Sequence, residues 1–292
     1  MDIQPAQSSD FFDIEKVFFK CFKNDAQRYP VKKATNLIIV QDNGKIVGAG
    51  GLFTNTLHAK VPKAAIAVES EYRRKGLGKK IHQAILQSQP DIPIGIDGCC
   101  FDNDLSAISF LSKLNYRPYL DCLIPLIDTS VDFPAFDEPK NLTVLNFNEA
   151  VSGGIEMNAI LRFLVNEYCE SHTWNPVTIP KDSPEWEEIA FGGINKDVSL
   201  IGLVDGSIVG ASTAGIEGDV LQIQWPFASA SDIRGKIALL NLLLARQFKM
   251  AQQRGLLKTT FECDSTEEAL LHVLKGLKIL KSETWRRFRF TQ

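Results

Sequence analysis

The order of predicted helices and strands occurs twice along the chain, and this repetition restricts the fold more than any single residue does. Each copy begins with a strand and a helical region, continues with a β-hairpin and a third strand, and then alternates helices with strands. A sheet of this kind needs helices to cover its faces, so each copy must bury a core of its own. The repetition therefore predicts an α/β fold with a mixed sheet (α+β type), in two tandem domains.

Hydrophobic periodicity and turn residues place the elements. In the first copy we expect strands at residues 3–5, 36–41, 45–53, 63–69, 92–100, 118–121 and 122–127, and helices starting near residues 8, 76 and 104. In the second copy we expect strands at residues 142–145, 199–204, 208–214, 220–225, 259–263 and 284–290, and helices at 155–170, 184–189, 233–254 and 266–274. Asn43-Gly44 and Asp205-Gly206 are the predicted hairpin turns.

The segment at residues 131–140 separates the two copies. It contains Pro134, Pro139 and several acidic residues, and it has no hydrophobic periodicity, which is typical of a linker. A chain of 292 residues also exceeds the usual size of one domain. We therefore predict a first domain at residues 1–130, a linker at 131–140 and a second domain at 141–292.

Charge and composition exclude several classes of protein. The net charge of -3 gives no general attraction to nucleic acid. The longest apolar stretch, residues 237–245, is too short to cross a bilayer, and the first residues do not resemble a secretion signal. The six cysteines form no CxxC pair and have no clustered histidines, which predicts reduced thiols and no metal site. We expect a soluble cytoplasmic protein that needs no nucleic acid, membrane or metal.

A basic, glycine-containing segment follows the predicted strand at residues 63–69. It reads Arg73-Arg74-Lys75-Gly76-Leu77-Gly78-Lys79-Lys80 and opens a helix. The free N–H groups at the start of a helix bind anions, and glycine lets the backbone approach a ligand closely. A Rossmann loop needs a third glycine where Ile81 stands, and a P-loop needs Ser or Thr after Gly-Lys. The segment therefore predicts a diphosphate-binding site that is neither a Rossmann loop nor a P-loop.

These residues resemble the Gcn5-related N-acetyltransferase (GNAT) family, which carries Arg/Gln-x-x-Gly-x-Gly/Ala after its fourth strand. Arg73-x-x-Gly76-x-Gly78 matches that motif at every position. A second family motif, Asn-x-x-Ala-x-x-x-Tyr-x-x-x-Gly-Phe, is similar to residues 104–116 only in part. Ala107 and the aromatic Tyr116 agree, whereas Leu111 replaces the tyrosine.

The resemblance implies two GNAT-like acyl-CoA N-acyltransferase domains and acetyl-CoA as co-substrate. In the family, a bulge in strand four separates it from strand five, and pantetheine lies in the gap. A backbone N–H near Val68 would polarise the thioester carbonyl, and an acceptor amine would attack directly. The resemblance assigns cofactor binding to Ala67, Val68, Arg73, Arg74, Lys75, Gly76, Leu77, Gly78, Lys79, Asn103 and Asp104.

The catalytic residues are less defined, because Leu111 cannot supply the proton that the family's tyrosine gives to the leaving thiolate. Tyr116 and Tyr119 are the substitutes that we consider. Glu69 is the first candidate for the base that receives the amine proton, Asp97 is the second and His58 the third. Cys99 and Cys100 lack an activating histidine and are interpreted as core thiols.

The second copy lacks the cofactor motif. Its corresponding segment contains only Arg234-Gly235-Lys236, so we interpret this copy as degenerate. The helix expected at residues 233–254 is apolar on more than one face, which predicts packing against the first half.

The leading hypothesis is therefore an N-acetyltransferase for the amine of a small molecule or peptide. A non-catalytic acyl-CoA sensor and a tRNA-dependent aminoacyltransferase are the alternatives. Neither the acceptor nor the oligomeric state follows from the sequence.

Overall fold

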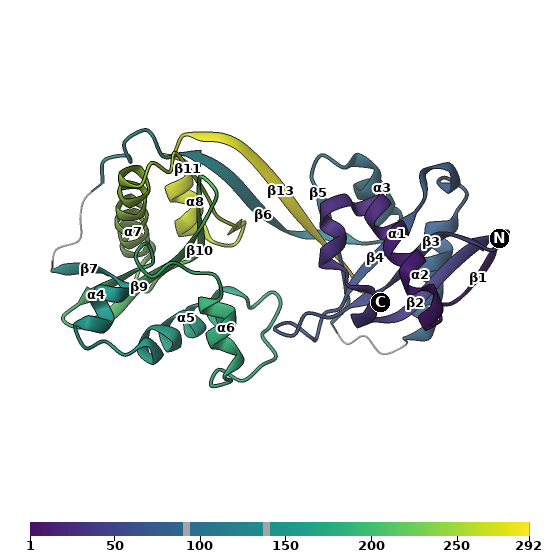
Figure 1. Ribbon diagram of the computed structural model, residues 1–292, viewed down its shortest axis with the longest axis horizontal. Helices are drawn as coiled ribbons and strands as arrows, with labels where there is room; N and C mark the ends of the chain where they lie inside the picture. The colour runs from purple at the N-terminus through teal and green to yellow at the C-terminus, as the bar shows by residue number, and fades with distance from the viewer. Residues whose placement is uncertain (90–93, 137–140, 292) are drawn as a thin grey trace. The chain divides into compact units, whose positions relative to one another are not determined.

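A computed structural model describes residues 1–89, 94–136 and 141–291, which form two compact units. Unit 1 contains Met1–Tyr119, Asn175–Thr178 and Arg287–Gln292, and unit 2 contains Leu120–Trp174 and Ile179–Arg286. Two paired strands, β6 (Arg117–Asp128) and β13 (Ile279–Phe290), each have one end in each unit (Figure 1). The units thus differ from a single division at the predicted linker, of which residues 137–140 lie outside the described residues.

Unit 1 is a mixed sheet between helices. Its elements are β1 (Asp2–Pro5), η1 (Ser8–Asp10), α1 (Phe11–Phe22), η2 (Lys23–Arg28), η3 (Val31–Lys33), β2 (Ala34–Asp42), β3 (Lys45–Phe53), β4 (Lys63–Val68), η4 (Ser70–Tyr72), α2 (Leu77–Ser88), β5 (Ile96–Phe101) and α3 (Leu105–Lys113), with parts of β6 and β13. The strand order is β1-β2-β3-β4-β5-β13-β6.

These elements confirm most of the predictions for the first copy. The hairpin turns at Asn43-Gly44, and α2 begins directly after Gly76. The strand expected from residue 92 begins at Ile96, and residues 92 and 93 lie outside the described residues. The two strands expected at 118–121 and 122–127 are wrong: β6 is continuous, because no turn-forming residue separates Asp121 from Cys122.

Each face of the unit 1 sheet has its own core. Ile14, Val17 and Phe18 of α1 pack on one face with Ala65 and Ala67 of β4, and α2 and α3 cover the other face. The glycines of β3 allow this close packing. A Cβ on Gly50 would lie 2.7 Å from Ile81 Cγ2 and 2.9 Å from Ala65 O. The small residues of β3 therefore set how near α2 lies to the sheet.

The end of β13 completes unit 1. Phe288 is 1% exposed and belongs to the core beneath α2. Gly95 has φ +120°, and a Cβ there would lie 2.4 Å from the Phe290 carbonyl oxygen. The chain end is thus inserted beside β5, a pairing that links residues almost 200 positions apart and that no local pattern predicts.

Unit 2 repeats the order of elements. Its elements are β7 (Leu142–Asn146), α4 (Phe147–Ser152), α5 (Met157–Ser171), α6 (Glu185–Phe191), β8 (Leu200–Val204), β9 (Ser207–Glu217), β10 (Val220–Ala228), α7 (Ile233–Gln253), β11 (Lys258–Thr260), β12 (Cys263–Asp264) and α8 (Glu268–Leu274). The strand order is β6-β11-β10-β9-β8-β7, and β12 also pairs with β6. The repeated mixed α/β fold is confirmed, although the strand expected at 259–263 is divided into β11 and β12.

The apolar residues of α7 are used within unit 2. Leu239, Leu240, Leu244 and Phe248 pack with Leu270 and other residues of α8 in one core. The second apolar face that the sequence showed is therefore covered by α8 rather than requiring the first half. Among the described helices, none combines the length and the apolar character needed to cross a membrane.

Candidate functional site

At the turn from β4 into α2, several backbone amides have no hydrogen-bond partner among the described residues. Gly76 is the N-cap of α2 with φ +78°, and no side chain caps this end. The first bond of the helix runs from the Lys80 amide to the Gly76 carbonyl at 3.1 Å, so the amides of residues 77–79 lie outside the helical ladder. Arg74 also has a positive φ, of 63°. A turn in which right-handed and left-handed residues alternate points successive N–H groups into one concavity, which favours an anion.

The side chains around this turn add positive charge. Arg74, Lys75 and Lys79 are exposed, whereas Leu77 is buried and anchors the first helical turn. Arg73 turns back, and its Nε donates to the Val68 carbonyl oxygen at 2.8 Å. Arg73 thus fixes the turn to the end of β4, and the Lys75 ammonium lies over the Tyr72 ring, 5.0 Å from its centre. The exposed side chains of Arg74 and Lys79 add positive charge near the start of the helix.

The first turn of α2 packs closely against α3. A Cβ on Gly78 would lie 2.9 Å from Phe110 Cε2, so the second glycine of the motif serves helix packing. At the start of α3, Asp104 Oδ1 accepts a hydrogen bond from the Ala107 amide at 2.9 Å. Asp104 therefore caps its own helix, and Asn103 beside it is exposed.

Strands β4 and β5 separate shortly after they meet. As described, they share one register pair, Lys63 with Asp97. The Glu69 amide donates to Val47 O, which makes the Gly48–Val68 pair a non-hydrogen-bonded one in the β3–β4 ladder. By alternation, the amides of Ile66 and Val68 point away from β3 and toward the gap.

A cavity of about 80 Å³ lies at this gap. It is lined by Phe22, Tyr29, Ala64, Ala65, Ile66, Gly98, Cys99, Ala107, Phe110, Leu111, Leu114 and Tyr116. The lining is mostly apolar, with two phenol groups and one thiol as its polar groups. Such a lining suits a flexible, weakly polar chain such as pantetheine.

The bulge expected in the fourth strand is not observed. The β3–β4 register runs without a shift from Gly48–Val68 to Phe53–Lys63. Side chains of α3, among them Phe110 and Leu111, form part of the wall of the cavity at this gap. A Cβ on Gly98 would lie 2.7 Å from Leu111 Cδ2, so Leu111 fills the space beside β5.

Tyr116 lies at this wall but is deeply buried, with 1% of its surface exposed. Its hydroxyl is 3.2 Å from His82 Nε2, a contact that the sequence did not predict. Burial, aided by the charge of Asp97, raises the pKa of the phenol. Burial lowers the pKa of His82, so the imidazole is neutral near pH 7. Tyr116 keeps its proton at every physiological pH.

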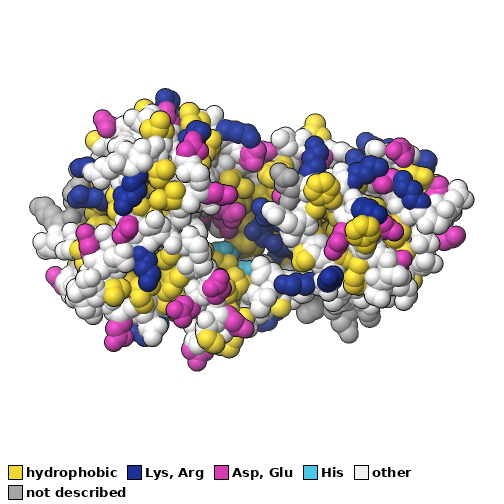
Figure 2. All heavy atoms as spheres, viewed as in Figure 1, with side chains coloured by type: hydrophobic (Ala, Val, Ile, Leu, Met, Phe, Trp, Pro, Cys, Tyr) yellow, Lys and Arg dark blue, Asp and Glu magenta, His cyan; other side chains and the backbone are white. Residues whose placement is uncertain are grey.

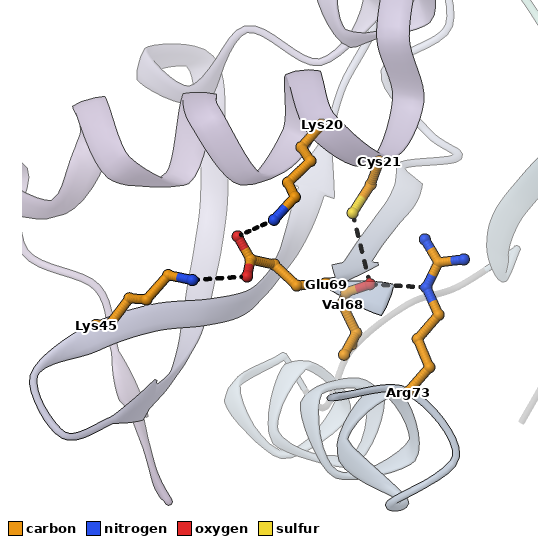
Figure 3. A network of polar contacts seen from close by, with 6 residues as sticks. All are labelled: Lys20, Cys21, Lys45, Val68, Glu69 and Arg73. Carbon is orange, nitrogen blue, oxygen red and sulfur yellow. Dashed lines mark hydrogen bonds and ion pairs between the residues drawn. The ribbon is translucent and has the colours of Figure 1, made fainter. Parts of the chain in front are cut away.

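Glu69, the first predicted base, is held between two lysines (Figure 3). Its side chain is 3.1 Å from Lys20 Nζ of α1 and 2.9 Å from Lys45 Nζ of β3. The hydrogen bond from Lys45 is the main cause that lowers the pKa of this carboxyl. An ion-paired carboxylate with a lowered pKa is a weak base, and these contacts favour a role in fixing the end of β4.

Asp97, the second predicted base, is bound by Arg289 and Tyr119. Arg289 donates to both carboxylate oxygens, at 2.8 and 3.2 Å, and the Tyr119 hydroxyl donates to Oδ2 at 2.5 Å. Arg289 also lies over the Tyr119 ring, 4.4 Å from its centre. Only the alternation Arg287-Phe288-Arg289-Phe290 hinted in the sequence that β13 would present arginines on one face.

The remaining candidates lie close to these residues. His58 is 7% exposed, and burial is the main cause that lowers its pKa. The Cys99 thiol is 3.5 Å from the Tyr29 hydroxyl at the cavity, whereas Cys100 is buried in the core as predicted. In the described ranges, no three His, Cys, Asp or Glu side chains are gathered as metal ligands.

The corresponding turn in unit 2 is built differently. Asp232 is the N-cap of α7, and its carboxylate accepts a hydrogen bond from the Gly235 amide at 2.7 Å. A negative charge thus already occupies the position where α2 has open space. The Gly235 amide therefore already has a partner within its own turn.

Comparisons with known proteins agree with this geometry. Residues 33–118 match the sequence profile of the acetyltransferase (GNAT) domain. This range includes β2 to β5, the turn before α2, and α3. No curated protein matches the chain by sequence.

Solved structures extend the likeness to the whole chain. A Gcn5-related N-acetyltransferase from Sphaerobacter thermophilus is 16% identical, with 98% of this chain and 94% of that chain covered at a TM-score of 0.60. A tandem GNAT protein from the clavulanic acid biosynthesis pathway is 10% identical, with 98% and 97% covered and a TM-score of 0.55. A GNAT acetyltransferase from Colwellia psychrerythraea is 13% identical over 100% of both chains, with a TM-score of 0.53. The chain therefore carries a GNAT acetyltransferase domain at residues 33–118 and has the fold of tandem Gcn5-related N-acetyltransferases.

Proposed function

We propose that this protein is an N-acetyltransferase that transfers an acetyl group from acetyl-CoA to the amine of a small molecule or peptide. One observation carries the proposal: the uncapped start of α2, with its positive φ residues and exposed cations, follows the strand that borders an apolar gap. The six cysteines have no disulfide partners, which fits a reducing compartment such as the cytoplasm.

The residues of unit 1 fit the co-substrate. A Cβ built on Gly76 meets nothing within 4 Å, so space is open in front of the helix. The amides of residues 77–79, with Arg74 and Lys79, would hold the pyrophosphate, and the gap beside Ile66 and Val68 would receive pantetheine. When bound, acetyl-CoA supplies an acyl thioester that an amine attacks.

We assign the proton transfers by the state of each side chain. Tyr116 lines the cavity and is the proposed proton donor because of this position, although burial raises its pKa and makes the phenol a weak acid. His58 is neutral near pH 7 and accepts a proton more readily than Glu69, which is ion-paired. Asp97 is proposed as a positioning residue for Arg289 and Tyr119. Catalytic roles for Glu69 and Asp97 stay predictions from the sequence.

Two observations favour a second candidate function, a sensor that binds acyl-CoA without turnover. Leu111 stands where the family's tyrosine is expected, and Tyr116 is hydrogen-bonded to His82 rather than free. No comparable observation favours the aminoacyltransferase alternative. On the face shown in Figure 2, basic side chains are mixed with acidic and hydrophobic ones instead of forming a stripe for tRNA.

The test combines CoA binding with turnover. Acetyl-CoA affinity is measured by calorimetry, and released CoA is measured with a thiol reagent across a panel of amines. The informative variant is Lys79→Glu, because a negative charge in the first turn stabilises a helix by about 0.3–1 kcal/mol. We expect acetyl-CoA binding to weaken by about tenfold or more while the melting temperature is kept. Lys16→Glu, an exposed reversal in α1, is the control for net charge.

The outcomes separate the candidates. Binding that weakens in Lys79→Glu alone, together with CoA release for at least one amine, supports the acetyltransferase. Binding without turnover for every amine favours the sensor. Equal affinity in both variants removes the start of α2 from the proposed site.

A further inference from the structure

Three strands of unit 1, β4, β5 and β13, present polar side chains on the face of the sheet that also carries α1. Phe288 and Phe290 pack beneath α2, so Arg287 and Arg289 point to the opposite face by strand alternation. Ile96 and Cys100 likewise pack beneath α2, which directs Asp97 and Cys99 to the α1 face. Ala65 packs with α1, so Lys63, two residues earlier in β4, shares that face.

Lys63 is unusual within this group. It is half-buried, yet no carboxylate among the described residues pairs with its ammonium, since its neighbour Asp97 is bound by Arg289. Burial lowers the pKa of Lys63, and the charge of Arg287 lowers it further. A half-buried, unpaired lysine costs folding free energy. Such an arrangement makes Lys63 a candidate ligand-binding residue.

The charges nearby are positive overall. Arg287 and Arg28 both act on Lys63, while Arg28 pairs with Asp25 at 3.2 Å. The Asp97 carboxylate acts on Lys63 in the opposite sense but is already shared with Arg289. The cavity lies directly beside the charged residues Lys63, Arg287 and Asp97, because neighbouring residues in β4 and β5, Ala64, Ala65 and Cys99, line it.

A second, independent observation comes from the segment Asn175–Thr178, which belongs to unit 1. Thr178 holds it to the loop before β4, with its amide donating to Leu57 O at 2.7 Å. Asn175 is 1% exposed, and its side-chain oxygen has no hydrogen-bond partner. The backbone of Asn175 and Pro176 binds His58, whose pKa also responds to the charges of Arg287 and Lys63. An orphaned buried acceptor thus lies in the same neighbourhood as the unpaired cation.

We propose that the acceptor amine carries an anionic group, a carboxylate or a phosphate, which binds the Lys63 ammonium with the charge of Arg287 in support. This inference rests on the proposed acetyltransferase function and names its substrate class. The anion pairs the lysine that the fold leaves unpaired, and its position beside Ala64 and Cys99 directs the amine toward the cavity. The unpartnered Asn175 oxygen is a hydrogen-bond acceptor for an N–H or O–H group of the same molecule.

The binding test uses product analogues, so it does not depend on turnover. N-acetylglycine and N-acetylglutamate are titrated against their amides, and N-acetylglucosamine 6-phosphate against N-acetylglucosamine, with CoA present. We expect the wild type to prefer one anionic set over its neutral counterpart by about tenfold or more, which also identifies carboxylate or phosphate. Lys63→Met should abolish that preference, Lys63→Arg should retain part of it, and the exposed Lys60→Met should leave it intact.

Acetyl-CoA affinity serves as the fold check and should be the same in all four proteins. A preference for an anion that disappears only in Lys63→Met supports the proposal. Equal binding of charged and neutral analogues, or a preference that survives Lys63→Met, overturns it. Failure of the acetyltransferase function has a different signature, namely acetyl-CoA binding without release of CoA by any amine.

Discussion

The starts of helices α2 and α7 show how two copies of one fold differ in what they can bind. Gly76 begins α2 with a left-handed backbone, no cap and exposed cations around it. Asp232 begins α7 with an extended backbone (φ -139°) and a carboxylate bound to the Gly235 amide. The same element order therefore gives an uncapped helix start in unit 1, which is the proposed anion site, and a helix start capped by its own side chain in unit 2.

The strands that precede these helices also differ, and here the irregular strand lies in unit 2. In unit 2, β10 pairs with β11 over three residues, and its register with β9 shifts between Ile223 and Trp225. In unit 1, β4 has no such shift and shares one register pair with β5. The irregular fourth strand that the family resemblance implies thus lies in the copy whose helix start is capped. The comparison teaches that the register of the fourth strand and the capping of the following helix vary independently in this fold.

The largest expected effect comes from giving α2 the N-cap residue of α7. Gly76→Asp should weaken CoA binding by about 100-fold or more, because the carboxylate would occupy the space in front of the start of α2 and repel the pyrophosphate. Gly44→Asp is the matched control, since Gly44 also has φ +78° and nothing within 4 Å of a Cβ. Calorimetry measures both affinities. Equal CoA affinities in the two variants would show that the start of α2 does not bind CoA.

The next effect concerns the N-cap residues of α3 and α8. Burial is the main cause that raises the pKa of Glu267, the N-cap of α8, to about 7. An unfolded glutamate titrates near pH 4.3, so the folded state binds the extra proton between about pH 4 and 7. Stability should therefore fall as pH rises through this window, by on the order of 2 kcal/mol. Urea unfolding at pH 4, 6 and 8 should show this slope in the wild type and lose it in Glu267→Gln.

The counterpart in α3 is the control for that experiment. Asp104 caps its helix through its side chain, and Asp104→Asn leaves Glu267 unchanged, so this variant should leave the dependence on pH in place. A wild-type stability that rises between pH 4 and 7 would contradict the assignment to Glu267.

A smaller effect is expected when the cap of α7 is removed. Asp232→Ala should lower the stability of unit 2 by about 1 kcal/mol, because the Gly235 amide loses its partner. The exposed Asp132→Ala is the control. The variant should still bind one CoA per chain, since α7 lacks a left-handed glycine and a full set of cations. Two CoA molecules per chain would show that the cap alone separates the copies.

The smallest effect concerns Glu69. Its pKa is lowered by Lys45, so its contribution to stability is present above the unfolded pKa near 4.3 and is lost as pH falls through the folded pKa. Glu69→Gln should cost less than about 1 kcal/mol at pH 7, because both lysines are about half exposed, and the cost should fall as pH falls through the folded pKa. Thermal unfolding checks this, and a 100-fold loss of acetyl transfer would instead restore Glu69 as the base.

Local sequence signals were sufficient to predict the uncapped start of α2. The run from Arg73 to Gly78 predicted a strand, a turn and a helix start, and α2 begins at Leu77 as that run requires. Left-handed glycines, charge and helix caps depend on neighbours within a few residues, so they are visible in one sequence. The hairpins and the repeated order follow from the same kind of signal.

Long-range pairing accounts for what the sequence did not predict. The partner of Asp97 is Arg289, which lies 192 residues later and arrives only because β13 inserts beside β5. The lysines that bind Glu69 come from α1 and β3. Lys63 showed no local pattern, since its isolation depends on every element packed around it. Such environments are properties of the tertiary fold rather than of periodicity or motif.

Amide hydrogen exchange with and without CoA tests the central claim most directly, because it reports on both helix starts in one unmodified protein. We predict that CoA protects the amides of residues 77–80 and leaves those of residues 233–236 unchanged. Protection at the start of α7, or no protection at the start of α2 under saturating CoA, would contradict the account.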